Sequence, residues 1–122
     1  MTSLRKSIKK GGEKLTDKIK EVSDVVTTND YAALVTIKVP PQMDKLLFHL
    51  KEEDTNNILY KIQGAQDEDF AVAEELKGET ALAKNGSTYE VVDEPWLYVR
   101  VLHKAAEAEA QGKSSCVVSG SS

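Results

Sequence analysis

The segment Pro95-Trp96-Leu97-Tyr98-Val99-Arg100-Val101-Leu102-His103 decides the fold. Its side chains alternate between two sets, Trp96, Tyr98, Arg100 and Leu102 in one and Leu97, Val99, Val101 and His103 in the other. Alternation with a period of two, in a segment rich in aromatic and β-branched residues, predicts a β-strand. Leu97, Val99 and Val101 should face a core, while the other set should be half exposed. Such a strand, aliphatic on one face and aromatic on the other, is predicted to lie in the middle of a sheet.

Similar alternating segments extend over most of the chain. Predicted strands span residues 31–39, 45–51, 57–64, 89–92 and 113–119, with Pro-, Gly- or Asn-containing turns between them. Expected core positions are Ala33, Val35, Ile37, Val39, Leu46, Phe48, Leu50, Ile58, Tyr60, Ile62, Cys116 and Val118. Residues 70–76 fit a strand or a short helical turn, and residues 105–112 fit a hairpin loop better than a helix. Seven or so short antiparallel strands predict an all-β sandwich, because no later segment has the helical length that parallel crossovers need.

The N-terminal residues follow a helical pattern instead. Their apolar residues lie within about 60° of one another at 100° per residue, and they are Leu4, Ile8, Leu15, Ile19, Val22 and Val26. Gly11-Gly12 interrupts this stripe, which predicts a loose basic segment over 1–12 and a helix from Glu13 to about Val22. We therefore expect a basic amphipathic helix or arm at 1–26, the sandwich at 27–119 and a flexible Gly/Ser tail at 120–122.

The charge is divided unevenly between this arm and the rest of the chain. Residues 1–20 hold seven basic and two acidic residues, a net charge of +5, whereas residues 21–122 hold nine basic and 18 acidic residues, a net charge of −9. The arm is expected to contact something anionic, such as the acidic body of a neighbouring copy. Packing of the helix on its own domain is the equal alternative. No aromatic residue precedes Tyr31, which disfavours membrane-surface and nucleic-acid binding.

The reactive side chains form no catalytic or metal-binding pattern. The single Cys116 excludes an intramolecular disulfide and a Cys-rich zinc site, and no base can be placed beside it. His49 and His103 are isolated and are expected to be ordinary surface or core-edge residues. No segment has the apolar length of a membrane span or the apolar core of a secretory signal. We predict no catalytic residue, no metal, no cofactor and no enzymatic activity.

Two acidic clusters lie in predicted turns. Asp67 and Asp69, with Glu68 between them and Glu74 and Glu75 nearby, form a possible ligand loop for calcium. The spacing does not match an EF-hand, so a solvated acidic loop is the preferred interpretation. The cluster at residues 52–54 is interpreted in the same way. Residues 85–87, Asn-Gly-Ser, are expected to form a hairpin turn.

Two stretches carry a family resemblance that covers roughly residues 30–120. Tyr60-Lys61-Ile62-Gln63-Gly64-Ala65-Gln66-Asp67 is followed about 30 residues later by Trp96-Leu97-Tyr98-Val99-Arg100-Val101. This pairing resembles discoidin-like β-sandwich domains and is similar to small β-sandwich virion proteins of tailed bacteriophages. The resemblance implies an antiparallel β-sandwich of jelly-roll or discoidin-like type. The body is shorter than that of discoidin lectins and lacks their Arg-rich or aromatic sugar-binding loops, which favours the phage resemblance.

The resemblance and the basic arm together lead to one functional expectation. The chain is expected to be a non-enzymatic virion protein of a tailed phage, made in the host cytoplasm, that decorates (cements) the capsid or belongs to the neck or tail. Its partners would be other virion subunits in many copies, with no membrane and no sequence-specific nucleic acid. The expected partner-binding residues are Leu4, Arg5, Lys6, Ile8, Lys9, Lys10, Leu15 and Ile19. The alternative is a carbohydrate-binding module that uses Tyr31 or Tyr89 with Asp67 and Asp69.

Overall fold

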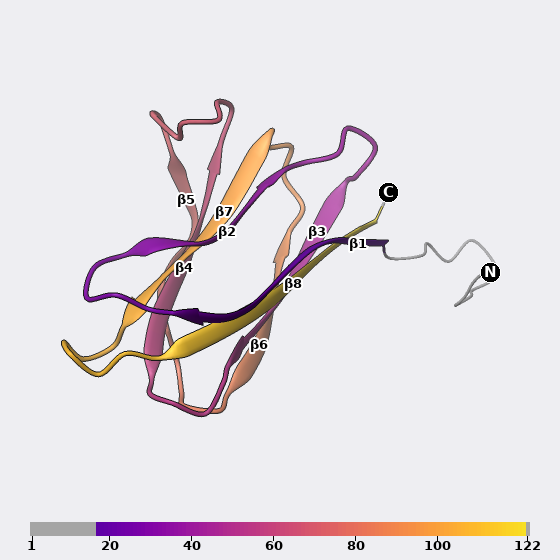
Figure 1. Ribbon diagram of the computed structural model, residues 1–122. Coiled ribbons are helices and arrows are strands. Elements are labelled where there is room, and N and C mark those ends of the chain that lie inside the picture. Colours follow the sequence, from indigo (N-terminus) through magenta and orange to yellow (C-terminus); the bar gives the residue numbers. More distant parts are fainter. Residues whose placement is uncertain (1–16, 122) are drawn as a thin grey trace.

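The computed structural model describes residues 17–121, which form two four-stranded antiparallel sheets packed face to face (Figure 1). The strands are β1 (Asp17–Val26), β2 (Ala32–Lys38), β3 (Lys45–Glu52), β4 (Ile58–Ala65), β5 (Glu74–Leu82), β6 (Ser87–Val92), β7 (Tyr98–Ala105) and β8 (Lys113–Ser121). Sheet I has the order β1-β8-β3-β6 and sheet II the order β2-β7-β4-β5. Every connection except that from β4 to β5 passes from one sheet to the other, as in a jelly roll. The predicted all-β sandwich of jelly-roll type is confirmed.

Strand β7 lies inside sheet II, where it pairs with β2 on one side and with β4 on the other. Its predicted central position is confirmed, and Val99 and Val101 are fully buried as expected. The prediction for Leu97 is wrong, because β7 begins one residue later and the Leu97 side chain is 54% exposed. The backbone carbonyl of Leu97 instead accepts a hydrogen bond from the amide of Val39 at 2.8 Å.

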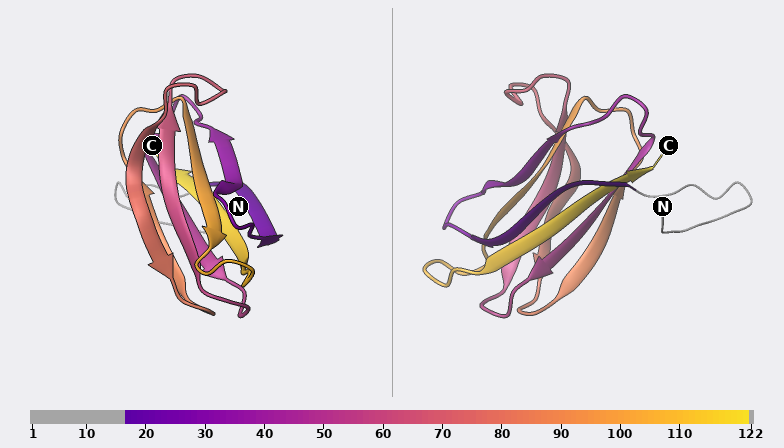
Figure 2. Two further views of the ribbon diagram at one scale, coloured as in Figure 1. Left: turned by 90° about the vertical axis from the view of Figure 1, so that its left-hand side faces the viewer. Right: turned by 45° about the vertical axis from the view of Figure 1, so that its right-hand side comes forward.

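The core lies between the sheets, which Figure 2 shows as two separate layers. It is formed mainly by the predicted inward sets of β3, β4, β7 and β8, and its largest fully buried side chains include Tyr60, Phe48, Leu50, Ile58, Ile62 and Val118. Each such aliphatic or aromatic side chain contributes about 1.5–3 kcal/mol by leaving water. Ala33 is an exception, because a register shift between Ala33 and Val35 leaves it exposed and buries Leu34.

Strand β1 replaces the C-terminal part of the predicted N-terminal helix. The helix prediction is wrong from Asp17 onward, because β1 pairs with β8 over its whole length. Two register shifts in this pairing leave Ile19, Val22 and Val25 half-buried against the core, three residues apart. A β-bulge adds one residue to a strand, so successive inward residues are three apart instead of two. A spacing of three is also the spacing of residues one turn apart on a helix. The sandwich therefore begins at Asp17, and residues 1–16 lie outside the described part.

Two further expectations need correction. Strand β8 continues to Ser121, so Gly120 and Ser121 belong to the sheet and not to a flexible tail. The segment 70–76, which fits a strand or a short helical turn, is divided between a turn at Phe70 and the start of β5, whose continuation to Leu82 was not predicted. Most of β5 is exposed at a sheet edge, so it lacks the inward apolar alternation that identifies a strand. No helix long and apolar enough to cross a membrane occurs among the described residues.

Candidate assembly surface

Strand β6 presents its apolar side chains to solvent and its charged side chain to the interior. Tyr89 and Val91 are 62% and 55% exposed on the outer face of sheet I. Glu90, between them, is half-buried and accepts a hydrogen bond from the hydroxyl of the core residue Tyr60. Lys77 of β5 lies 3.7 Å from the same carboxylate. An inward charge on an edge strand protects that edge from uncontrolled pairing, while the outward apolar residues provide a contact surface.

The pairing of β6 with β3 fixes this orientation. Val92 is opposite Leu46 and Thr88 is opposite Leu50, with an unbroken register between them. A slip of one residue would turn every side chain of β6 to the other face of the sheet. Such a slip would remove Val92 from the core, where it is 6% exposed. The outward position of Tyr89 and Val91 is therefore set by the register and by the burial of Val92.

The outward residues of β6 continue into an apolar patch across sheet I. We define this patch by Leu47, His49, Tyr89, Val91 and Val117, whose side chains are exposed or half-buried. Tyr89, His49 and Val117 occupy one row of the register, and Val91 and Leu47 occupy another. The rings of His49 and Tyr89 stack with centroids 4.3 Å apart and an interplanar angle of 13°. The stacking joins these two side chains across β3 and β6.

Val91 separates two hollows in this surface. The smaller, of about 120 Å³, lies toward β3 and β8 and is lined by Lys45, Leu47, Val91, Ser119, Gly120 and Ser121. The larger, of about 220 Å³, lies at the open side of the sandwich between β5 and β6. Its walls are Leu76, Val91, Val92, Asp93 and Glu94. The patch is thus an apolar ridge with concave surfaces on both sides.

A buried carboxylate fixes the loops at the opposite end of the sandwich. Glu52, predicted to belong to a solvated acidic cluster, is 0% exposed, so that prediction is wrong for this residue. Its oxygens accept hydrogen bonds from the backbone amides of Thr55 at 3.0 Å, Asn85 at 2.8 Å and Lys113 at 3.1 Å, and also from the Thr55 hydroxyl. One side chain therefore joins the β3–β4 loop, the β5–β6 turn and the start of β8.

These hydrogen bonds also determine the charge state of Glu52. Burial alone opposes the charged form, but the hydrogen bonds from Thr55, Asn85 and Lys113 outweigh it and lower the pKa to about 2. The carboxylate is consequently ionised at neutral pH. The predicted hairpin turn at residues 85–87 is confirmed, with Asn85 in the left-handed region at φ 60°.

Two further reactive side chains are enclosed in the core. His103, expected at the surface or the core edge, is 1% exposed, and its Nδ1 lies 2.8 Å from the hydroxyl of Ser114. Burial lowers the pKa of His103 to about 4, so its ring is neutral at pH 7. Cys116 is equally buried, and burial raises the pKa of its thiol to about 12. Neither arrangement offers an accessible nucleophile.

The expected partner-binding residues divide between two parts of the chain. Leu4, Arg5, Lys6, Ile8, Lys9, Lys10 and Leu15 lie outside the described residues. Ile19 lies on β1, where it packs half-buried against the core. Its methyl group at Cδ1 would lie 2.8 Å from a Cβ at Gly120, which shows how tightly β1 and β8 are packed there. Ile19 therefore has a structural role within the sandwich.

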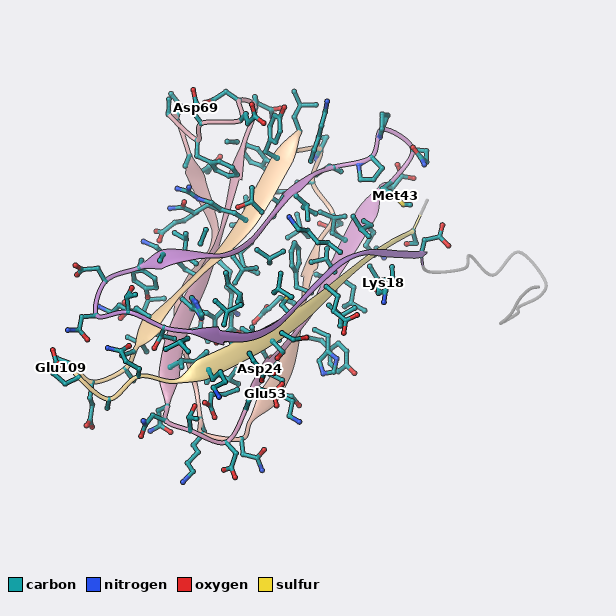
Figure 3. All side chains as sticks on the ribbon, in the orientation of Figure 1. Lys18, Asp24, Met43, Glu53, Asp69 and Glu109 are labelled. Atoms are coloured by element: carbon teal, nitrogen blue, oxygen red, sulfur yellow. The ribbon has the colours of Figure 1, made fainter. Side chains whose placement is uncertain are left out.

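The possible ligand loop lies between β4 and β5. Asp69 is exposed near the tip of this loop (Figure 3). The Asp67 carboxylate accepts a hydrogen bond from the amide of Ala71 at 3.0 Å, so it stabilises its own turn. Among residues 17–121, no three His, Cys, Asp or Glu side chains gather in a way that could hold a metal ion. The structure does not bring Asp67 and Asp69 together with other ligands.

Tyr31, the other candidate sugar-binding aromatic residue, is engaged on sheet II. Its hydroxyl donates to Glu79 at 2.7 Å, and the amino group of Lys61 lies 4.5 Å from its ring centre. Burial and the neighbouring Glu79 raise the pKa of Tyr31 above its usual range. Tyr89 lies on sheet I, so the two tyrosines do not form one site.

Neither the apolar patch nor the role of Glu52 was predicted from the sequence. The signal for the patch was present in β6, where Tyr89 and Val91 alternate with Glu90 while Val92 breaks the alternation. From such a segment alone, either set of side chains could face the core, and the pairing with β3 decides which set does. For Glu52, the signal was an acidic residue at the end of a strand, three residues before Thr55 and four before Asn56, which have side chains suited to turns.

No known sequence family matches the chain, and no curated protein matches it. Solved structures similar to its fold include a pilus protein and a viral coat protein. Bacillus endospore appendages, which form disulfide-linked pili, are represented by a chain with 13% identity and a TM-score of 0.52, with 97% of this chain and 98% of that chain covered. The coat protein dimer of Tobacco streak virus has 12% identity and a TM-score of 0.50, with 94% and 90% covered. At such identities the likeness shows a shared fold alone.

Proposed function

We propose that the chain is a non-enzymatic structural subunit that assembles in many copies within the virion of a tailed phage. In this proposal it cements the capsid or belongs to the neck or tail. The apolar patch on sheet I carries the proposal, because an edge strand with outward Tyr89 and Val91 gains stability when a neighbour covers it. The pilus and coat proteins with the same fold support a role in assembly. The basic N-terminal segment and the sequence resemblance support the phage setting.

The association is noncovalent in this proposal. The chain has one cysteine, Cys116, and its side chain is 1% exposed. A disulfide between two copies would require the sandwich to open. Attachment would therefore depend on burial of apolar surface and on the repetition of modest contacts around a symmetric particle, which multiplies them by avidity.

A carbohydrate-binding module has less support. The hydroxyl of Tyr31 is already bonded to Glu79, and Asp67 is bonded within its own loop. The apolar patch is better suited to another protein surface than to a sugar.

The proposal is tested by sedimentation velocity of the full chain over a range of concentrations. The wild-type chain is expected to form larger species as its concentration rises. The double variant Tyr89→Ser/Val91→Thr is expected to remain a folded monomer. Val72→Thr is the matched control, because Val72 is 82% exposed but lies in the β4–β5 loop outside the patch. A wild-type chain that stays monomeric throughout, or a double variant that associates like the control, would contradict the proposal.

A further inference from the structure

We propose that the hollow between β5 and β6 receives the basic N-terminal segment, residues 1–16, of a neighbouring copy. This inference rests on the proposed function, which requires copies to associate, and it names the site where one contact is made. The hollow is the larger of the two beside Val91, with a volume of about 220 Å³. It lies between the edge strand of sheet I and the edge strand of sheet II, so it is open to a neighbour.

The hollow has an acidic rim and a mostly polar exposed lining, with apolar side chains beside it. Leu76 and Val92 pack against the core at its base, and Val91 forms one wall. Asp93 and Glu94 are exposed at its border. The Glu94 carboxylate accepts a hydrogen bond from the Trp96 indole at 3.2 Å and retains further acceptor capacity, because a carboxylate has about four lone-pair sites. This border is suited to a ligand that carries both aliphatic and cationic side chains.

The N-terminal segment has the complementary composition. Residues 1–16 hold five basic residues and one acidic residue, a net charge of +4. The aliphatic Leu4 and Ile8 alternate with the pairs Arg5-Lys6 and Lys9-Lys10. The volume of the hollow admits an aliphatic side chain beside Leu76 and Val91. The adjacent lysines would then face Asp93 and Glu94, and opposite charges of this kind select the partner and its orientation.

A neighbouring copy is the source that the proposed function requires, because an arm held in its own hollow would not join copies. Asp17 shares a row of sheet I with Gly120, Leu46 and Val92, so it lies three strand spacings from β6. At about 4.8 Å per strand, its own hollow is only about 14 Å away. Ile8, nine residues before Asp17, reaches up to about 30 Å and Leu4 up to about 43 Å. Both its own hollow and that of a neighbouring copy are therefore within reach, and cross-linking distinguishes the two sources.

The first test is disulfide trapping between two single-cysteine labels on the full chain. Copies carrying Ile8→Cys are mixed with copies carrying Asp93→Cys, oxidised and separated without reductant. The native Cys116 is buried and stays unreactive. The matched control is Ala108→Cys, an exposed position in the β7–β8 loop at the other end of the sandwich. We expect at least fivefold more cross-linked dimer with Asp93→Cys than with Ala108→Cys.

Each outcome separates the two proposals. Equal cross-linking of both labels, in chains that still associate by sedimentation, overturns the hollow as the docking site and leaves the assembly role intact. A wild-type chain that does not associate refutes the assembly role itself. The double variant Ile8→Cys/Asp93→Cys is expected to give a ladder of linked copies, and a single internally linked monomer would overturn the neighbouring source.

A charge exchange provides a second test that does not depend on engineered cysteines. Asp93→Lys/Glu94→Lys is expected to weaken association at least tenfold, and Lys9→Glu/Lys10→Glu is expected to do the same. The combination of all four changes is expected to restore it. The control Asp30→Lys/Glu107→Lys makes the same change in charge at exposed positions of the other end and should leave association within twofold of wild type. Weakening without restoration would contradict direct pairing.

Discussion

Replacing Glu52 by Gln tests how the loops of the sandwich are held together. The change keeps the shape of the side chain but removes its charge and one acceptor oxygen. One oxygen of Glu52 accepts from the amides of Thr55 and Asn85, and the other accepts from Thr55, Asn56 and Lys113. Whichever oxygen becomes an NH₂ group, at least one buried N–H loses its acceptor, which costs about 1–3 kcal/mol.

The pKa of Glu52 gives an independent magnitude. A decrease from an ordinary value of 4.5 to about 2 corresponds to about 3 kcal/mol of stability at neutral pH. Because the folded-state pKa is the lower one, this contribution is fully present above pH 4.5 and is lost as the pH falls toward 2. By the same relation, about 1 kcal/mol of this stabilisation remains at pH 3. Glu52→Gln should therefore be destabilised by about 3 kcal/mol at pH 7 and by much less at pH 3.

Urea unfolding followed by Trp96 fluorescence measures this difference at both pH values. Glu53→Gln is the matched control, because Glu53 is only half-buried and its ion pair with Lys51, at 3.6 Å, is exposed to solvent. It should change stability by less than about 0.5 kcal/mol. A Glu52→Gln variant as stable as wild type at pH 7, or a deficit that does not shrink at pH 3, would refute the reasoning.

Three further predictions concern the core. Burial lowers the pKa of His103 from 6.5 to about 4, so on acidification His103 is protonated in the unfolded chain before it is protonated in the folded one. The free energy of unfolding should therefore fall by about 2 kcal/mol from pH 7 to pH 5. Urea titrations should show this fall in wild type but not in His103→Gln. In Gly64→Ala the new Cβ would lie 2.6 Å from Cδ2 of Trp96, and thermal unfolding should show a loss of about 1–3 kcal/mol in stability. The control Gly78→Ala should not lose stability, because no atom lies within 4 Å of its new Cβ. Cys116 should resist iodoacetamide at pH 8 until urea unfolds the chain, and rapid labelling of the folded protein would contradict its burial.

The sequence predicted those parts of the fold that alternate simply. From Leu46 to Leu50 in β3 and from Ile58 to Ile62 in β4 every second residue is aliphatic or aromatic, and the structure buries these sets. In β8 the structure buries the expected Cys116 and Val118. The two stretches of the family resemblance also meet in space, because the Trp96 ring packs directly over Gly64. Alternation of this kind depends only on the geometry of a strand, so it can be read without knowing the partners.

The errors have a common physical cause, which is that pairing with other strands overrides local pattern. The bulges of β1 place Ile19, Val22 and Val25 at helix-like spacing, and only the register with β8 shows them to belong to a strand. Strand β6 has apolar residues on its outer face because β3 fixes its register. Glu52 is buried because Asn85 and Lys113, which are distant in the sequence, supply hydrogen bonds in addition to the local one from Thr55. The distant contacts cannot be predicted from a single segment.

The central claim, that copies associate through β6 and the N-terminal segment, is tested most directly by hydrogen–deuterium exchange with mass spectrometry. The full chain is compared at a concentration where sedimentation gives monomers and at one where it gives assemblies. The account predicts that peptides from residues 1–16 and from β6 become protected together in the assemblies, while peptides from the β7–β8 loop do not change. Assemblies in which β6 and residues 1–16 exchange as fast as in the monomer would contradict it.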